Sequence, residues 1–238
     1  ALAPDPEQIE QVAKQLCLAK RPIFVVGGGA QHASSEVLRM AEMLQAPVTF
    51  FRSGKGVIDE RHYLSQSFPA GHRLWADADV VLAIGTRLKY QQMYWGLDKN
   101  LKILRIDIDP TEINRISTPE LGIVADARTA LEALLPLVES YNIPRPSRRE
   151  ELNYLKTEFQ EAFEDKIAPQ MGYLRVIREE LPEDGFFVDE VTQVGFASWY
   201  AFPTYHPRHF ISAGYQGTLG YGYATALGVQ AAHPDKKV

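Results

Sequence analysis

The chain contains 238 residues, of which 45% are hydrophobic and 23% are charged, so it can bury a core for one large or two modest domains. Its formal net charge of -5 argues against nucleic acid or an anionic membrane surface as a partner, because both attract clustered Lys and Arg. The single cysteine, Cys17, excludes an internal disulfide and a zinc site with paired thiolates. No apolar run approaches the roughly 20 residues of a membrane span, so we expect a soluble protein of the reducing cytoplasm.

The start of the chain has the pattern of a β-α-β unit. Apolar residues at helical spacing predict helices over residues 7–19 and 34–44. Apolar runs predict buried strands over residues 23–26 and 47–51. The turn Gly27-Gly28-Gly29 connects the first strand to the second helix.

Further strands follow a stretch from Arg52 to Leu74 that we interpret as rich in loops. Strands are predicted over residues 79–85, 103–110 and 122–125, and a helix with one apolar side over residues 127–138. Because the strands are apolar over nearly their whole length, they imply a parallel sheet covered by helices on both faces.

A segment rich in proline and charge, residues 141–151, has the composition of a linker. We therefore predict the α/β fold class, with a parallel-sheet Rossmann-like central domain over residues 1–140 and an incomplete α/β domain over residues 152–238. Two helices and two strands are expected in this second part, over residues 152–163, 173–181, 186–189 and 209–212.

The glycine turn is the first candidate for a ligand site, because such a turn brings backbone N–H groups close to a phosphate. The dinucleotide fingerprint G-x-G-x-x-G would need a glycine where His32 stands. A tight turn that merely needs small residues is the alternative. Asp109 has two interpretations as well, since it could contact a ribose or cap the helix that starts at Pro110.

The glycine series at residues 214–222 is the richest segment, because four glycines within nine residues permit a close backbone approach to a ligand. A tightly packed loop before a buried helix is the alternative. The order of Gly217-Thr218-Leu219-Gly220-Tyr221-Gly222 resembles the G-T-M-G-x-G stretch of acetolactate synthases and related thiamine diphosphate enzymes. Asp189-Glu190-Val191-Thr192-Gln193 resembles the D-V-G-Q-H segment that opens the cofactor domain of that family.

The first part of the chain agrees, so the resemblance covers nearly the whole sequence. Segments similar to the central domain of the family are residues 21–23, 27–30, 54–56, 78–87 and 106–110.

The resemblance implies an enzyme that uses thiamine diphosphate and Mg²⁺ to decarboxylate a 2-oxo acid or to join it to a second carbonyl compound. Residues 191–193 would lie along the diphosphate, and the carbonyl of Gly217 would accept a hydrogen bond from the 4'-amino group. Leu219 would be the apolar wedge that keeps the cofactor bent. Synthases most often have methionine at this position, which leaves a decarboxylase open, including a benzoylformate-decarboxylase-like enzyme. The implied cofactor-binding residues are Val191, Thr192, Gln193, Gly217, Thr218 and Leu219.

Two parts of the active site of the family are expected outside this chain. The Mg²⁺ ligands would follow Val238, and the domain with the activating glutamate would precede Ala1. We therefore expect no catalytic and no metal-binding residue here, and an isolated fragment that is inactive. Because the family shares its active site between subunits, we expect the full-length protein to be a homodimer or homotetramer.

The identity of a nucleotide ligand stays open. The central domain of synthases often holds FAD, but residues 66–77 lack the G-M-H-G run that we expect of a flavin binder. A competing interpretation is a non-catalytic module that binds FAD or ADP through the Gly27 turn alone. Candidate substrates of the enzyme are pyruvate, benzoylformate and glyoxylate.

Overall fold

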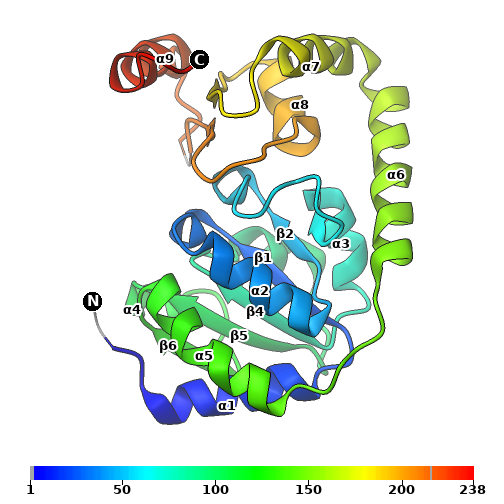
Figure 1. Ribbon diagram of the computed structural model, residues 1–238, viewed down its shortest axis with the longest axis vertical. Coiled ribbons are helices and arrows are strands. Elements are labelled where there is room, and N and C mark those ends of the chain that lie inside the picture. Colours follow the sequence, from blue (N-terminus) through cyan, green and yellow to red (C-terminus); the bar gives the residue numbers. More distant parts are fainter. Residues whose placement is uncertain (1–2, 215) are drawn as a thin grey trace.

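The computed structural model describes residues 3–214 and 216–238, and its strands confirm the predicted α/β class. The strands of this part of the chain are β1 (Pro22–Val26), β2 (Val48–Phe50), β3 (Ser65–Gln66), β4 (Val80–Ile84), β5 (Lys102–Asp107), β6 (Leu121–Val124), β7 (Phe187–Val188) and β8 (Phe210–Ile211). They form a six-stranded parallel sheet in the order β3-β2-β1-β4-β5-β6 and a separate parallel pair of β7 and β8 (Figure 1).

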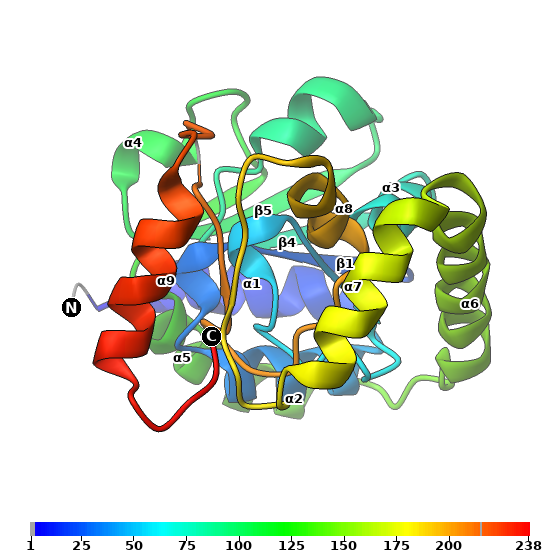
Figure 2. The same ribbon diagram turned by 90° about the horizontal axis from the view of Figure 1, so that it is seen from above.

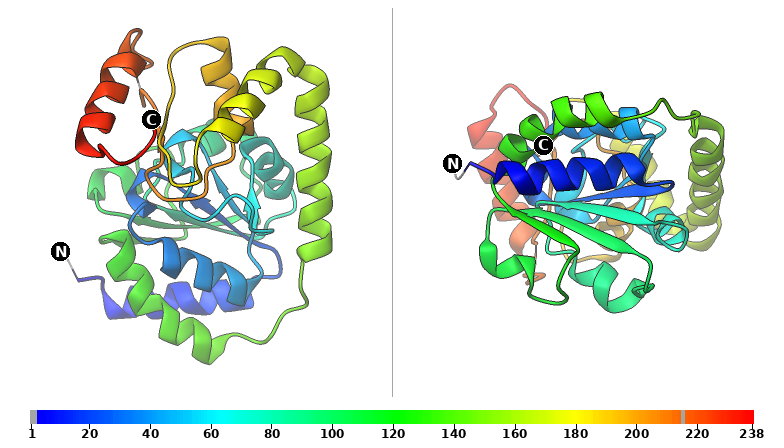
Figure 3. Two further views of the ribbon diagram at one scale, coloured as in Figure 1. Left: turned by 45° about the horizontal axis from the view of Figure 1, so that its top comes forward. Right: turned by 90° about the horizontal axis from the view of Figure 1, so that it is seen from below.

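Helices surround the large sheet and form most of the second part of the chain. The α-helices are α1 (Pro6–Leu18), α2 (Ser34–Leu44), α3 (Phe68–Trp75), α4 (Pro110–Ile113), α5 (Ala127–Tyr141), α6 (Arg149–Lys166), α7 (Ala168–Glu180), α8 (Gln193–Ala201) and α9 (Tyr221–Ala232). Helices α1 and α2 both pack against α5 beside the sheet, and α3 packs on β2. In the right-hand view of Figure 3, from below, α1 lies in front of the large sheet.

The core of the sheet follows from the apolar runs of the sequence. Strands β1 and β4 are buried along their whole length, as the pattern of a parallel sheet predicts. Helix α1 begins where the Asp5 carboxylate accepts a hydrogen bond from the N–H of Glu7 at 2.9 Å, with Pro6 in the first turn. Its residues Ile9, Val12 and Leu16 are buried against the core.

Helix α6 joins the sheet to the second group of elements and runs along one side of the molecule (Figure 1). Leu152 and Leu155 at its start pack into the core of the sheet. A second hydrophobic cluster lies beyond its end, around Met171, Phe187 and Phe202. The domain division at residues 141–151 stays a prediction.

Two helices lie where the sequence pattern predicted none. Helix α3 falls in the stretch that we interpreted as rich in loops, because Pro69 and Gly71 obscure its apolar pattern. Helix α8 is apolar on most sides and lacks the spacing of a surface helix. Gly71 has a packing role, because a β-carbon there would lie 2.1 Å from Thr49 Oγ1 on β2.

The chain adds strands β1 to β3 toward one edge of the sheet and β4 to β6 toward the other edge. The crossover between these two directions lies between β1 and β4, which are neighbours in the sheet. The backbones of the loops that follow these two strands lie in close contact. A β-carbon at Gly27 would lie 2.4 Å from the carbonyl oxygen of Gly85, and one at Gly29 would lie 2.8 Å from its Cα. The glycine turn is therefore needed for packing, which supports the tight-turn interpretation. Open α/β sheets bind ligands at such a crossover point.

Two helical glycines allow a matched test of this packing. We expect Gly71→Ala to lower the free energy of unfolding by about 1–3 kcal/mol, because Thr49 is fully buried and must shift. Gly172→Ala in α7 meets no atom within 4 Å, so it should raise that free energy by about 0.5–1 kcal/mol through helix propensity alone. Urea denaturation of both variants measures the difference. Stabilisation by both substitutions would contradict the contact between α3 and β2.

Candidate functional site

The candidate site lies where β7 ends and α8 begins. Asp189, the residue after β7, is buried, and its side chain accepts hydrogen bonds from Trp199 Nε1 at 2.5 Å and from Ser212 Oγ at 2.7 Å. The backbone N–H of Ala213 donates to the same carboxylate at 3.3 Å. Burial raises the pKa of Asp189, while these hydrogen bonds oppose the rise. Asp189 thus fixes the segment before α8 to the start of the glycine series.

Glu190 joins the two motif segments directly. One of its carboxylate oxygens accepts from the N–H of Val191 at 2.7 Å, and the other accepts from the N–H of Gly222 in the first turn of α9 at 2.8 Å. These two backbone hydrogen bonds lower the pKa of Glu190. A β-carbon at Gly222 would lie 2.8 Å from the carbonyl oxygen of Asp189. Glycine is therefore required where α9 meets this loop.

The first group of predicted cofactor-binding residues forms the entry to α8. The Thr192 hydroxyl accepts a hydrogen bond from the N–H of Gly195 at 3.0 Å and so caps the helix. The side chain of Gln193 accepts from Gln170 Nε2 of α7 at 2.9 Å. Val191 lies half-buried at the turn. Backbone N–H groups at a helix start attract anions, so this end of α8 is suited to a phosphate.

The second group, Gly217, Thr218 and Leu219, lies on the open loop before α9. Gly217 has a φ of 58°, and nothing lies within 4 Å of the position that a β-carbon would take. Leu219 is 76% exposed, although it is large and apolar. Within the described residues, no hydrogen bond joins this group to residues 191–193. The structure brings the two motifs together through Glu190, which contacts the backbone of Gly222 and Gly220.

A pocket of ≈ 840 Å³ opens beside these segments, at the crossover point of the sheet. Gly28, Arg52, Ser212 and Gly214 are among the residues that line it. The Arg52 guanidinium lies over the Trp199 ring, 4.4 Å from its centroid, and burial lowers its pKa. Among the residues that the structure describes, no hydrogen-bond partner is found for this guanidinium. A half-buried guanidinium whose N–H groups lack acceptors is suited to an anionic ligand.

Two other side chains that the sequence singled out have structural roles. His32 Nε2 lies 2.8 Å from a carboxylate oxygen of Asp126, which caps α5. The Asp109 carboxylate accepts from the N–H of Thr111 at 2.9 Å and caps α4, so the capping interpretation of Asp109 is confirmed. Neither arrangement needs a ligand.

Sequence reasoning missed the residues that hold the site together, namely Asp189, Glu190 and Arg52. Asp189 ends the strand predicted over residues 186–189 and Glu190 follows it, where α/β folds place functional groups, and that position was the available signal. Arg52 has no comparable signal, because its importance rests on the ring of Trp199, 147 positions further along the chain.

No group of three or more His, Cys, Asp or Glu side chains in residues 3–214 and 216–238 could hold a metal ion. In the same residues, every helix is too short or too polar to cross a membrane.

Comparison with known proteins identifies the family. Residues 9–134 match "Thiamine pyrophosphate enzyme, central domain", and residues 190–238 match "Thiamine pyrophosphate enzyme, C-terminal TPP binding domain". The chain belongs to the thiamine pyrophosphate enzyme family. The resemblance that was predicted from the segments 189–193 and 217–222 is thereby confirmed. The second match begins at Glu190, inside the candidate site.

Three relatives show how much of a family member the chain represents. It is 31% identical to a probable 2-ketoarginine decarboxylase of Pseudomonas aeruginosa and 29% identical to the acetolactate synthase isozyme 1 large subunit of Escherichia coli, over 98% of the chain and 43% of each relative. It is 32% identical to a probable acetolactate synthase large subunit of Methanocaldococcus jannaschii, over 96% of the chain and 42% of that protein. The chain therefore spans less than half the length of these relatives.

The bridge made by Glu190 can be tested by amide hydrogen exchange. We expect Glu190→Ala to accelerate exchange in α9, because the Gly222 amide loses its acceptor. Since the pKa of Glu190 is lowered in the folded chain, the bridge should persist at neutral pH and weaken as the pH falls through that lowered value. The variant should lack this pH dependence.

The control for this experiment is Glu180→Gln, which changes an exposed carboxylate on α7 and should leave α9 unchanged. Equal exchange in α9 of Glu190→Ala and the unmodified chain, at neutral pH, would show that the bridge does not hold the helix.

Proposed function

We propose that this chain is part of a thiamine-diphosphate-dependent decarboxylase or carboligase that acts on a 2-oxo acid. The observation that carries the proposal is the junction at Glu190, where the N-terminal end of α8 and the first turn of α9 are tied together inside the segment that matches the cofactor-binding domain. Thiamine diphosphate, when bound, supplies the electron sink for loss of carbon dioxide from the substrate.

The residues of this chain would bind and orient the cofactor. The start of α8, with Val191, Thr192 and Gln193, offers backbone N–H groups for the diphosphate. The carbonyl of Gly217 would accept a hydrogen bond from the cofactor, and the left-handed glycine has open space at the position of a β-carbon. Thr218 lies beside it on the same open loop. Exposed Leu219 would bury its side chain against the cofactor and hold the two rings folded toward each other.

Further features of the full-length protein belong to the same proposal. Mg²⁺ would be held by residues beyond this chain, which would leave the isolated chain inactive. We propose a homodimer or homotetramer. Two large side chains of α9, Tyr223 and Leu227, are 78% and 55% exposed, and exposed apolar surface of this kind is typical of an interface. A cytoplasmic location and the division into domains at residues 141–151 stay predictions.

The function is tested on the full-length protein that contains this chain. Thiamine diphosphate with Mg²⁺ should raise its unfolding midpoint, and carbon dioxide should be released from pyruvate, benzoylformate or glyoxylate. Leu219→Ala should lower kcat about tenfold to a hundredfold, because the cofactor relaxes from its bent form. Leu219→Met should retain activity, since methionine is also bulky and apolar.

The isolated 238-residue chain is the companion sample. We expect neither a rise of its midpoint with thiamine diphosphate and Mg²⁺ nor decarboxylation. If thiamine diphosphate and Mg²⁺ leave the unfolding midpoint of the full-length protein unchanged, the proposed function is refuted. Activity of the isolated chain would refute only the claim that the metal ligands lie elsewhere.

A nucleotide in the crossover pocket is the second candidate function, as a FAD or ADP site. The position of the pocket at the strand ends supports it, together with the Arg52 guanidinium, for which no hydrogen bond is found within the described residues. ADP or FAD should raise the unfolding midpoint of the 238-residue chain, and Arg52→Gln should weaken that binding about tenfold through loss of a charged hydrogen bond. Arg39→Gln, which removes a surface ion pair with Glu139, is the control. An unchanged midpoint with both nucleotides would exclude this site.

A further inference from the structure

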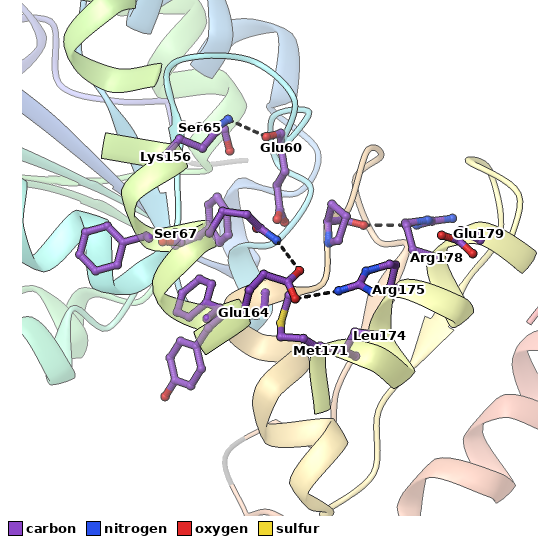
Figure 4. A pocket seen from close by; sticks show the side chains of 17 residues that line it. Glu60, Ser65, Ser67, Lys156, Glu164, Met171, Leu174, Arg175, Arg178 and Glu179 are labelled. Carbon is purple, nitrogen blue, oxygen red and sulfur yellow. Dashed lines mark hydrogen bonds and ion pairs between the residues drawn. The ribbon is translucent and has the colours of Figure 1, made fainter. Parts of the chain in front are cut away.

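A second pocket, of ≈ 280 Å³, lies between the edge of the large sheet and the helices α6 and α7. Figure 4 shows Glu60, Ser65 and Lys156 together at one end of it, and Met171 and Leu174 toward the other. It shares no lining residue with the predicted cofactor-binding set. In the view from above, α6 and α7 lie on the opposite side of the molecule from α9 (Figure 2).

The polar end of this pocket carries a cation with unused bonding capacity. Lys156 Nζ donates to the backbone carbonyls of Glu60 at 2.7 Å and of His62 at 2.8 Å, which leaves one of its three ammonium protons. Burial lowers the pKa of Lys156 to about 8, so the amine is still mostly protonated at pH 7.

Ser65 adds a second group that lacks a partner. The residue is 2% exposed, and its Oγ has no hydrogen-bond partner within residues 3–214 and 216–238. Native proteins pair most buried polar atoms, and leaving a hydroxyl unpaired costs about 1–3 kcal/mol. Ser65 lines the pocket together with Lys156. A ligand atom that accepts hydrogen bonds would satisfy both groups.

The charges around this end favour an anion. Lys55 is fully buried and its Nζ lies 3.0 Å from the Glu60 carboxylate. Two ammonium groups, on Lys55 and Lys156, lie near the Glu60 carboxylate, and the carboxylate of Asp59 also attracts Lys156. At the far end, Arg175 is paired with Glu164 at 2.7 Å. The ammonium of Lys156 is the cation best placed to receive a further negative charge.

Beyond the polar end, apolar side chains form the middle of the pocket, before the ion pair of Arg175 and Glu164 at the far end. Phe159 and Phe163 of α6 face Met171 and Leu174 of α7, with Phe50 from the end of β2. The volume is just below the range of about 300–1,000 Å³ that is usual for ligand pockets. A ligand that fits must be small, with one anionic end and a short hydrocarbon tail.

We propose that this pocket binds a small aliphatic monocarboxylate, whose carboxylate accepts hydrogen bonds from Lys156 Nζ and Ser65 Oγ while its tail packs between α6 and α7. The proposal does not depend on the proposed function, because it uses none of the cofactor residues.

The test uses hexanoate as the probe and the 238-residue chain with ¹³C-labelled methionine methyl groups. The chain has four methionines, of which Met171 lines the pocket and Met93 lies elsewhere. Hexanoate at millimolar concentration should shift the Met171 signal saturably and leave Met93 unchanged. 1-Hexanol, with the same tail and no charge, should bind at least about tenfold more weakly.

Two variants separate binding from folding. Ser65→Ala should weaken hexanoate about fivefold by removing one hydrogen bond, while its unfolding midpoint should not fall, since the hydroxyl has no partner to lose. Leu174→Trp should abolish the shift by filling the pocket, and Tyr154→Phe, on the exposed side of α6, should bind as the unmodified chain does. The proposal is refuted if Met171 does not respond to hexanoate, or if 1-hexanol binds equally well.

Discussion

The close passage of backbone segments around the crossover of the large sheet is the constraint on which the rest of the structure depends. Gly29 and Gly85 meet there, and a β-carbon on Gly54 would lie 2.3 Å from the carbonyl oxygen of Val26. The same loop continues to Gly56, where a β-carbon would lie 2.2 Å from the carbonyl oxygen of His206. A side chain at Gly29, Gly54 or Gly85 would separate the loops at the strand ends, and one at Gly56 would push the second group of elements away from them.

This contact explains why the pocket at the crossover is bounded by both halves of the chain. Arg52 stands on the same loop, two residues before Gly54, and its guanidinium lies over the Trp199 ring of α8. Trp199 in turn donates to Asp189, which also binds the start of the glycine series. The pocket and the candidate cofactor site are thus linked by one continuous set of contacts, from the sheet to the entry of α9.

Much of this arrangement could be predicted from the sequence, because apolar strands and two ordered motifs are local signals. The strands β1, β4 and β5 and the helices α1, α2 and α5 lie close to their predicted positions. Helix α3 was missed because its Pro69 and Gly71 are typical of loops, and α8 because it is covered on most sides. Glu190 and Arg52 were missed because their roles depend on partners that only the folded chain brings near. The places of Thr192 and Gln193 at a helix start were implied by family resemblance, not by spacing.

Helix α6 determines how the two halves of the chain are set relative to each other. Its 18 residues span about 27 Å at 1.5 Å per residue, and Leu152 and Leu155 fix its first turns to the core of the sheet. An added or lost residue in its middle would turn everything after it by about 100°, so that Phe159 and Phe163 would no longer face α7. Only insertions or deletions close to whole turns would keep these phenylalanines directed at α7, so the length of the helix sets the spacing of the two halves.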